Sequence, residues 1–282
     1  MKTYSLCFQC FLKQAHSAAS FLTEDDDKLV WVMKDVAAML PNLDIDDNPA
    51  YNSSLVLHRV NEMMGSNDPF RQARLKYDRI AAELIPRLRE EINWSADPFE
   101  MAVRISVVGN VIDLGIKSDV DLEGTLELAK GAGFKIFQID ELQAALAKSK
   151  RLLYILDNAG EIAFDLLLIE QIKKTGKTVL AAVRGGPILN DAVMEDAKIV
   201  GLDKLCKVID TGSNYVGVIR SKCSALFLKA LDSADAVIAK GQGNYETLEG
   251  TRPAAFFILK AKCAPVAEHI GVQEGDLVLK RA

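Results

Sequence analysis

Two patterns of apolar and polar residues divide the chain. In the first hundred residues, apolar side chains recur every three or four positions, which predicts amphipathic helices over 7–22, 28–40 and 70–94. A further helix is predicted over 48–65, because it begins with Asn-Pro, a capping residue followed by the residue that favours the first helical position. Pro86 is expected to kink the longest of these helices. No strand pattern precedes residue 134.

Beyond residue 134, short apolar runs alternate with helical segments. The alternation predicts right-handed βαβ units and a mostly parallel sheet that is covered on both faces. We therefore expect a helical N-terminal domain at 1–100 and an α/β domain at 101–282. Strands are predicted at 135–139, 152–156, 178–183, 205–209, 236–239, 256–260 and 277–280. The helices between them are predicted at 141–150, 163–174, 192–199 and 216–231.

Composition and charge exclude several classes of protein. The 282 residues are 49% hydrophobic and carry a net charge of −5, with no basic block, which argues against a protein that binds nucleic acid by neutralising phosphates. No apolar run approaches the roughly 20 residues of a membrane helix, and no secretion signal is recognisable, so we expect a cytoplasmic protein without a membrane partner. Five cysteines, an odd number, predict free thiols rather than a disulfide framework.

Polar residues collect where the predicted strands end. The four junctions read ILDNAGE, AAVRGGPILND, VIDTGSN and VIAKGQGN. Because the carboxyl ends of parallel strands meet at one edge of a sheet, carboxylates, amides and cations from these junctions are expected to converge there. Oxygen ligands suit Mg²⁺ or Mn²⁺, whereas Arg and Lys suit phosphate. The candidates are Asp157, Asn158, Glu161, Arg184, Asn190, Asp191, Asp210, Asn214, Lys240 and Asn244.

Two observations leave alternatives open. Asp157 precedes a predicted helix, so on its own it is equally well explained as a helix cap. Cys7 and Cys10 form a C-x-x-C pair in helical sequence without a second such pair, and they can be structural thiols, metal ligands or redox-sensitive groups. The three histidines lie outside the junctions and are expected on helix surfaces.

Several motifs together resemble the metal-dependent damage-control phosphatases, formerly a domain of unknown function, and in particular their stand-alone prokaryotic branch. The matching segments are DNAGE at 157–161, VRGGPILNDA at 183–192, AKGQGNYETL at 239–248, GNVID at 109–113 and the early C-x-x-C pair. The family combines a helical N-terminal region with a Rossmann-like α/β domain, which agrees with the pattern of elements.

The resemblance implies a metal-dependent phosphatase that hydrolyses small phosphomonoester metabolites, such as sugar phosphates, phosphopantetheine derivatives or damaged nucleotides. It implies a divalent cation (Mn²⁺, Ni²⁺, Co²⁺ or Mg²⁺) held by Asp157, Asn158 and Asp191. Lys240 would join Asp157 and Asp191 in catalysis. The residues implied on the substrate side are Asn110, Asp113, Glu161, Arg184, Lys240 and Asn244. The sequence does not indicate an oligomeric state.

Three other functions compete with this one. In a phosphatase of the haloacid-dehalogenase type, Asp157 would be a nucleophile, but Ala159 stands where those enzymes place a second Asp. The chain can also be a non-hydrolytic phospholigand-binding protein. An S-adenosylmethionine-dependent methyltransferase would need a glycine-rich turn after its first strand, which DNAG matches poorly.

Overall fold

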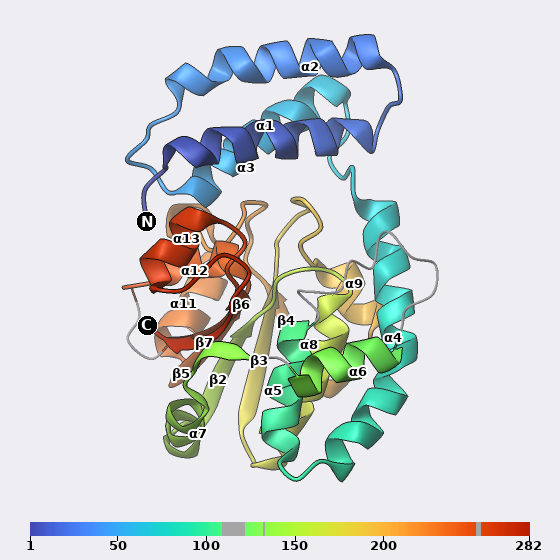
Figure 1. Ribbon diagram of the computed structural model, residues 1–282, viewed down its shortest axis with the longest axis vertical. Helices are drawn as coiled ribbons and strands as arrows, with labels where there is room; N and C mark the ends of the chain where they lie inside the picture. The colour runs from blue at the N-terminus through green and yellow to red at the C-terminus, as the bar shows by residue number, and fades with distance from the viewer. Residues whose placement is uncertain (109–121, 132, 252–254) are drawn as a thin grey trace.

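Three helices form a separate layer at the N-terminus of the chain. The computed structural model describes residues 1–108, 122–131, 133–251 and 255–282. Helices α1 (Ser5–Ser20), α2 (Asp26–Met39) and α3 (Pro49–Met64) lie above the rest of the molecule (Figure 1). Together with Phe70 and Ile188 they enclose an apolar core, to which α1 contributes Phe11 and Ala15. The predicted helices of this region are thereby confirmed.

Helices α4 (Arg71–Trp94) and α5 (Pro98–Val108) belong by packing with the sheet. Their buried residues share one apolar core with helix α8 (Glu161–Lys174). Pro86 lies inside α4, which continues through it as one helix. A further helix, α6 (Leu122–Gly131), packs against α5. The predicted division of the chain at residue 100 stays a prediction, although this packing places α4 with the α/β part.

The sheet has seven strands in the order β1-β7-β6-β5-β2-β3-β4. All neighbours are parallel except β6 and β7, so β1 and β7 run against the other five strands. The predicted strands and the mostly parallel sheet are confirmed. The strands are β1 (Phe134–Phe137), β2 (Arg151–Ile155), β3 (Thr178–Val183), β4 (Lys207–Asp210), β5 (Ala236–Lys240), β6 (Ala255–Lys260) and β7 (Leu277–Arg281).

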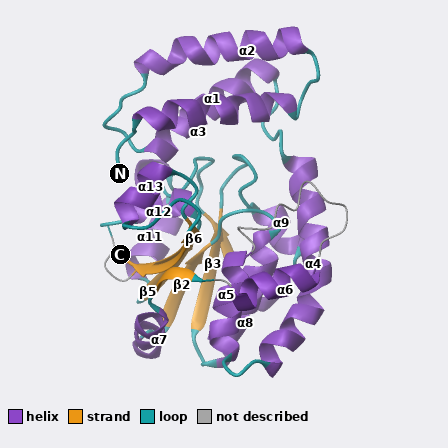
Figure 2. Ribbon diagram, viewed as in Figure 1, coloured by secondary structure: helices purple, strands orange, loops and turns teal. Residues whose placement is uncertain are grey.

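Helices cover both faces of the sheet (Figure 2). One face packs on α4, α5 and α8, and it receives alternate residues of each strand, such as Ala236 and Ile238 of β5. The other face receives Val237 and Ala239. The remaining helices of the sheet region are α7 (Ile139–Lys148), α9 (Met194–Ile199), α10 (Leu202–Leu205), α11 (Ala225–Ser233), α12 (Gln242–Leu248) and α13 (Ala264–Ile270). None of the described helices is long and apolar enough to cross a membrane.

The helix predicted over 216–231 is the prediction that differs most from the observed structure. The structure has a short 3₁₀ helix at Arg220–Lys222, and α11 begins only after Ser224, whose hydroxyl accepts from the N–H of Phe227 at 3.2 Å. Gly217 has a φ of +69°, and a Cβ there would overlap the backbone of Gly243. The apolar spacing of 216–224 therefore belongs to a loop that packs closely on α12.

Candidate functional site

Two loops lie side by side at the carboxyl edge of the sheet, one after β2 and one after β3. The carbonyl of Asp157 accepts from the N–H of Ala192 at 2.8 Å. Next to this bond, Asn158 and Asp191 pair as an isolated antiparallel bridge. The predicted meeting of Asp157, Asn158 and Asp191 is thus observed. The site falls between β2 and β5, where successive strands lead away in opposite directions, the usual ligand position in open α/β sheets.

Each of these three side chains keeps one oxygen free of hydrogen bonds from the described residues. Oδ2 of Asp157 accepts from Nδ2 of Asn158 at 3.0 Å, and Oδ2 of Asp191 accepts from Nε of Arg184 at 2.7 Å. The Oδ1 atoms of Asp157, Asn158 and Asp191 have no donor in the described part of the chain, and all three remain accessible to solvent. Burial raises the pKa of Asp191 to about 6, even though Arg184 opposes this shift.

Gly241 allows β5 to approach the carboxylate of Asp157. Its φ is +80°, and a Cβ at this position would overlap the carboxylate atoms of Asp157. A side chain would therefore be unfavourable here for two reasons, the backbone conformation and the lack of space.

Arg184 and Asn244 lie behind Asp191. Nη2 of Arg184 donates to Oδ1 of Asn244 at 3.0 Å, and Nδ2 of Asn244 donates to the carbonyls of Leu156 at 3.1 Å and Lys240 at 2.7 Å. These buried bonds fix the orientation of Asp191. Substrate contact by Arg184 and Asn244 stays a prediction, and the structure gives each of them a partner within the protein.

Glu161 is the first residue of α8 and contacts Asn158. Its Oε1 accepts from Nδ2 of Asn158 at 2.7 Å, while its buried Oε2 has no partner in the described residues. Burial, with the nearby charge of Asp157, raises the pKa of Glu161 to about 8. Because Glu161 and Asp157 both attract the amide nitrogen of Asn158, they turn its oxygen away from themselves. This contact adds an orienting role to the substrate contact predicted for Glu161.

Lys240 points to the opposite side of the sheet from α12. Its Nζ donates to Oδ1 of Asp165 on α8 and to the carbonyl of Ser106, both at 2.7 Å, and the side chain is fully buried. Lys240 follows Ala236 and Ile238 at the two-residue period of a strand, so it shares their face. The phosphate contact predicted for Lys240 stays a prediction; the observed partner of its ammonium is Asp165.

A cavity of about 250 Å³ lies between this edge of the sheet and the N-terminal helices. Its polar side is formed by Asp157, Asn158, Asn190, Asp191 and Lys262. Helix α1 covers the opposite side with Leu6, Cys7, Cys10, Phe11 and Gln14. Asn48 attaches α3 beside the cavity, since its Nδ2 donates to the carbonyl of Glu246 at 2.6 Å.

Lys262 supplies the cation that the cavity contains. It follows β6 by two residues, and its ammonium forms no ion pair with the described residues. Lys262 is exposed to solvent, and the carboxyl groups of Glu161, Asp157 and Asp191 raise its pKa against the opposing effect of partial desolvation. Lys262 was not among the residues predicted from the sequence. The signal for it was its position after the strand predicted over 256–260. The segment LKAKC contains no glycine, unlike the four predicted junctions, so it was not recognised as part of the site.

The thiols of Cys7, Cys10 and Cys263 line the same cavity. Burial raises the pKa of each of them, which favours the thiol over the reactive thiolate. No group of three or more His, Cys, Asp or Glu residues in the described ranges is arranged to hold a metal ion.

The other predicted residues lie apart from this cavity or outside the described residues. Asn110 and Asp113 fall in the segment 109–121, which the structure does not describe. Asp210 is exposed at the end of β4, where it accepts from the N–H of Gly212 at 2.8 Å. The carbonyl of Asn214 contacts the ring of His58 at 2.9 Å.

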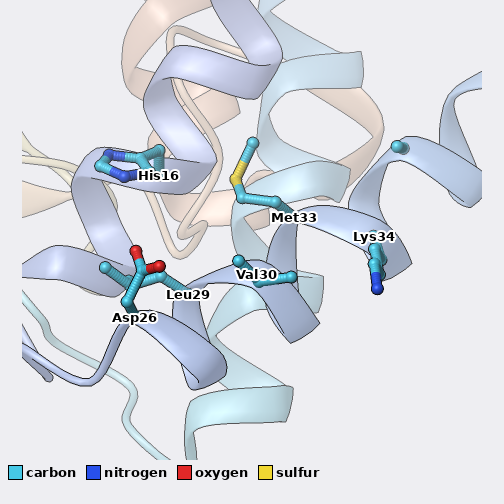
Figure 3. Close-up of a pocket in the computed structure, with 7 residues that line it drawn as sticks. His16, Asp26, Leu29, Val30, Met33 and Lys34 are labelled. Atoms are coloured by element: carbon cyan, nitrogen blue, oxygen red, sulfur yellow. The ribbon is translucent and has the colours of Figure 1, made fainter.

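A second hollow lies between α1 and α2 on the outer side of the helical layer (Figure 3). It is lined by His16 together with Asp26, Val30, Met33 and Lys34. None of the residues predicted for catalysis or binding contributes to it, so the cavity at the sheet edge is the candidate functional site.

The position of the site at the reversal of strand order defines a doubly wound α/β protein that binds its ligand at the sheet edge. A family model described as a damage-control phosphatase ARMT1-like domain matches residues 3–278. A damage-control phosphatase of Archaeoglobus fulgidus is 33% identical over 287 residues, covering 99% of each chain. One from Pyrococcus horikoshii is 37% identical over 286 residues, covering 100% of this chain and 98% of the relative. An uncharacterised protein of Methanocaldococcus jannaschii is 38% identical over 283 residues, covering 97% of this chain and 93% of the relative.

The three-dimensional comparison agrees. The crystal structure of a DUF89 family protein from Pyrococcus horikoshii matches with a TM-score of 0.94 at 37% identity, covering 100% of this chain and 99% of that one. The chain belongs to the damage-control phosphatase family, as the resemblance of its motifs indicated.

Proposed function

We propose that this protein is a divalent-cation-dependent phosphatase that hydrolyses small phosphomonoesters at the edge of the sheet. The observation that supports this most strongly is that one oxygen on each of Asp157, Asn158 and Asp191 accepts no hydrogen bond from the described residues, while all three side chains line the cavity. Lys262 adds an ammonium group on the same side of the cavity, where it forms no ion pair with the described residues.

The chemistry of these side chains fits a hard cation. Two carboxylates and an amide supply the oxygen ligands that Mg²⁺ and Mn²⁺ prefer, and substrate oxygens and water complete such sites. The raised pKa values of Asp191 and Glu161 reflect buried acidic groups without enough positive charge nearby. A cation held by Asp157, Asn158 and Asp191 would supply that charge. Mn²⁺, Mg²⁺, Co²⁺ and Ni²⁺ are all candidates.

The residues around the ligands would each have a defined part in hydrolysis. The cation supplies Lewis-acid polarisation of a phosphoryl oxygen when it is bound. Lys262 would neutralise charge on the non-bridging oxygens as water attacks phosphorus and the alcohol leaves. Arg184 holds one oxygen of Asp191, and Glu161 holds the amide nitrogen of Asn158, so both would keep ligand oxygens directed at the cavity.

The cavity favours small substrates. Its volume of about 250 Å³ lies at the lower end of ligand sites, and it contains one cation, Lys262, in its described wall. A single phosphate on a small body, such as a sugar phosphate, fits these properties better than a nucleotide with several phosphates. Gln14, Ser53 and Gln242 also line the cavity, where Ser53 bonds Gln14 and Gln242 bonds Glu246.

The test is release of inorganic phosphate from a panel of sugar phosphates and other phosphomonoesters, with each metal and with EDTA. We expect activity only with an added cation, and a loss of about 100-fold or more in Asp157→Asn. Asp210→Asn is the matched control, because Asp210 lies at the same edge of the sheet without lining the cavity. Equal activity in the wild type and Asp157→Asn would overturn the proposal. Calorimetry with S-adenosylmethionine tests the methyltransferase alternative.

A further inference from the structure

Helix α4 carries a buried acidic side chain that reaches the loop after β2. Oδ1 of Asp78 accepts from the N–H of Gly160 at 2.7 Å, and the side chain is fully buried. Gly160 stands two residues beyond Asn158. This contact therefore joins α4 to the segment that supplies two of the proposed cation ligands.

The same cluster also holds the loop after β3. Asp196, which is fully buried on α9, accepts from the N–H of Val193 at 2.6 Å, and Val193 stands two residues beyond Asp191. The guanidinium of Arg74 on α4 bonds Asp196 and, at 2.6 Å, Asp68. One face of α4 thus contacts the loop after β2 directly, through Asp78, and the loop after β3 through the bond from Arg74 to Asp196.

Asp78 and Asp196 complete the connection between the two loops. Burial first, and then a hydrogen bond with the carboxyl group of Asp196, raise the pKa of Asp78 to about 8. Oδ2 of Asp78 and Oδ1 of Asp196 find no N–H or hydroxyl donor among the described residues. A hydrogen bond between these two carboxyl groups requires one proton, because ionised carboxylates can only accept.

We propose that Asp78 is a positioning residue that, through Gly160 on one side and Asp196 on the other, sets the spacing of the two loops carrying Asp157, Asn158 and Asp191. The inference rests on the proposed function, because it concerns the affinity of the site for a cation. Asp78 does not line the cavity.

The test is the dissociation constant for Mn²⁺, measured by electron paramagnetic resonance without substrate. Asp78→Ala removes the acceptor for Gly160 and the donor for Asp196, and we expect the Kd to rise about 10-fold, the lower end of the cost of losing outer-sphere partners. Asp78→Asn keeps both contacts, since its amide accepts from Gly160 and donates to Asp196. We expect it to retain the wild-type Kd within about 3-fold.

Asp235→Ala is the control for a purely structural effect. Asp235 also accepts from backbone N–H groups, those of Lys150 at 2.9 Å and Arg151 at 2.8 Å, but it does so at the amino end of β2. Its removal is expected to lower stability and leave the Kd for Mn²⁺ unchanged.

The outcomes separate this inference from the proposed function. If the wild type binds none of Mn²⁺, Mg²⁺, Co²⁺ and Ni²⁺, the proposed function fails, and this inference fails with it. If the wild type binds Mn²⁺ and folded Asp78→Ala binds it equally well, only the inference is overturned. If Asp78→Ala does not fold, Asp78→Ser, whose hydroxyl is too short to serve both partners, takes its place in the same comparison.

Discussion

Asp157 and Asp191 each use one carboxylate oxygen inside the protein and leave the other open to the cavity. Asn158 occupies Oδ2 of the first, and Arg184 occupies Oδ2 of the second. The free oxygen matters because a carboxylate whose two oxygens are both hydrogen-bonded has less capacity to bind a cation. Glu161 serves the same end when it holds the nitrogen of the Asn158 amide.

Gly241→Ala is expected to weaken Mn²⁺ binding and phosphatase activity together. An added methyl group would overlap the carboxylate of Asp157 and displace it. We expect a Kd for Mn²⁺ raised about 10-fold or more, measured by isothermal titration calorimetry.

Gly176→Ala separates this effect from backbone strain. Gly176 has a φ of +78°, similar to the +80° of Gly241, but a Cβ there meets no atom within 4 Å. Both variants should lose about 1 kcal/mol of stability because of the positive φ. Only Gly241→Ala should lose affinity, and an equal loss in both would contradict the account.

At the scale of elements, the polar side of the cavity comes from the sheet and its cover comes from α1. The layer of α1 to α3 is attached near the site by α3. The N–H of Val216 donates to Oγ of Ser54 at 2.9 Å, and the rings of Tyr51 and Tyr215 stack at 5.6 Å. This arrangement predicts that α1 controls substrate access without affecting the cation.

Cys10→Trp tests that separation. The larger side chain would fill part of the cavity from α1, so kcat/KM for a phosphomonoester should fall about 10-fold or more, while the Kd for Mn²⁺ stays within about 2-fold of wild type. Gln9→Trp is the matched control, because Gln9 is an exposed neighbour on α1 that does not line the cavity. A parallel loss of Mn²⁺ binding in Cys10→Trp would contradict the separate roles.

The strands and the edge that holds the site were predictable from the sequence because buried parallel strands are short, continuous apolar runs. Their carboxyl ends must meet, so Asp157 and Asp191 were expected together. The direction of each side chain was harder to predict. Lys240 ends its strand on the face of α8, and the signal for this was Asp165, an acidic residue within the apolar run FDLLLI that needs a buried cation.

The cover of the cavity was not predictable, for a related reason. Periodicity identifies the apolar stripe of α1, but it does not reveal which other element that helix faces. Cys7 and Cys10 therefore had three open interpretations, and only packing places them beside Cys263 at the cavity. The late start of the helix predicted over 216–231 likewise depends on contact between Gly217 and α12, which lies far away in the sequence.

For the whole molecule, buried acidic groups make stability depend on pH. Burial raises the pKa of Glu246 to about 7, although a hydrogen bond of 2.8 Å from Gln242 opposes the shift. The folded protein keeps this carboxyl protonated when the unfolded chain has already ionised it. The stability contributed by Glu246 is therefore fully present below about pH 4 and is lost as the pH rises through about 7.

Glu246→Gln should remove that loss. Between pH 4.5 and 7.5, the unfolding free energy of the wild type is expected to fall by on the order of 3 kcal/mol more than that of Glu246→Gln. Urea unfolding in EDTA at the two pH values measures it. Other buried acids, such as Glu161, leave some pH dependence in the variant. Glu268→Gln, an exposed change on α13, should show no such shift.

The most direct test of the cation site is the anomalous diffraction of Mn²⁺ in crystals of the wild-type protein. The account predicts a peak within bonding distance of Oδ1 of Asp157, Oδ1 of Asn158 and Oδ1 of Asp191. It also predicts that the peak is lost in Asp191→Asn crystals. A peak at the thiols of Cys7, Cys10 and Cys263 instead, or no peak at the sheet edge at saturating Mn²⁺, would contradict the account.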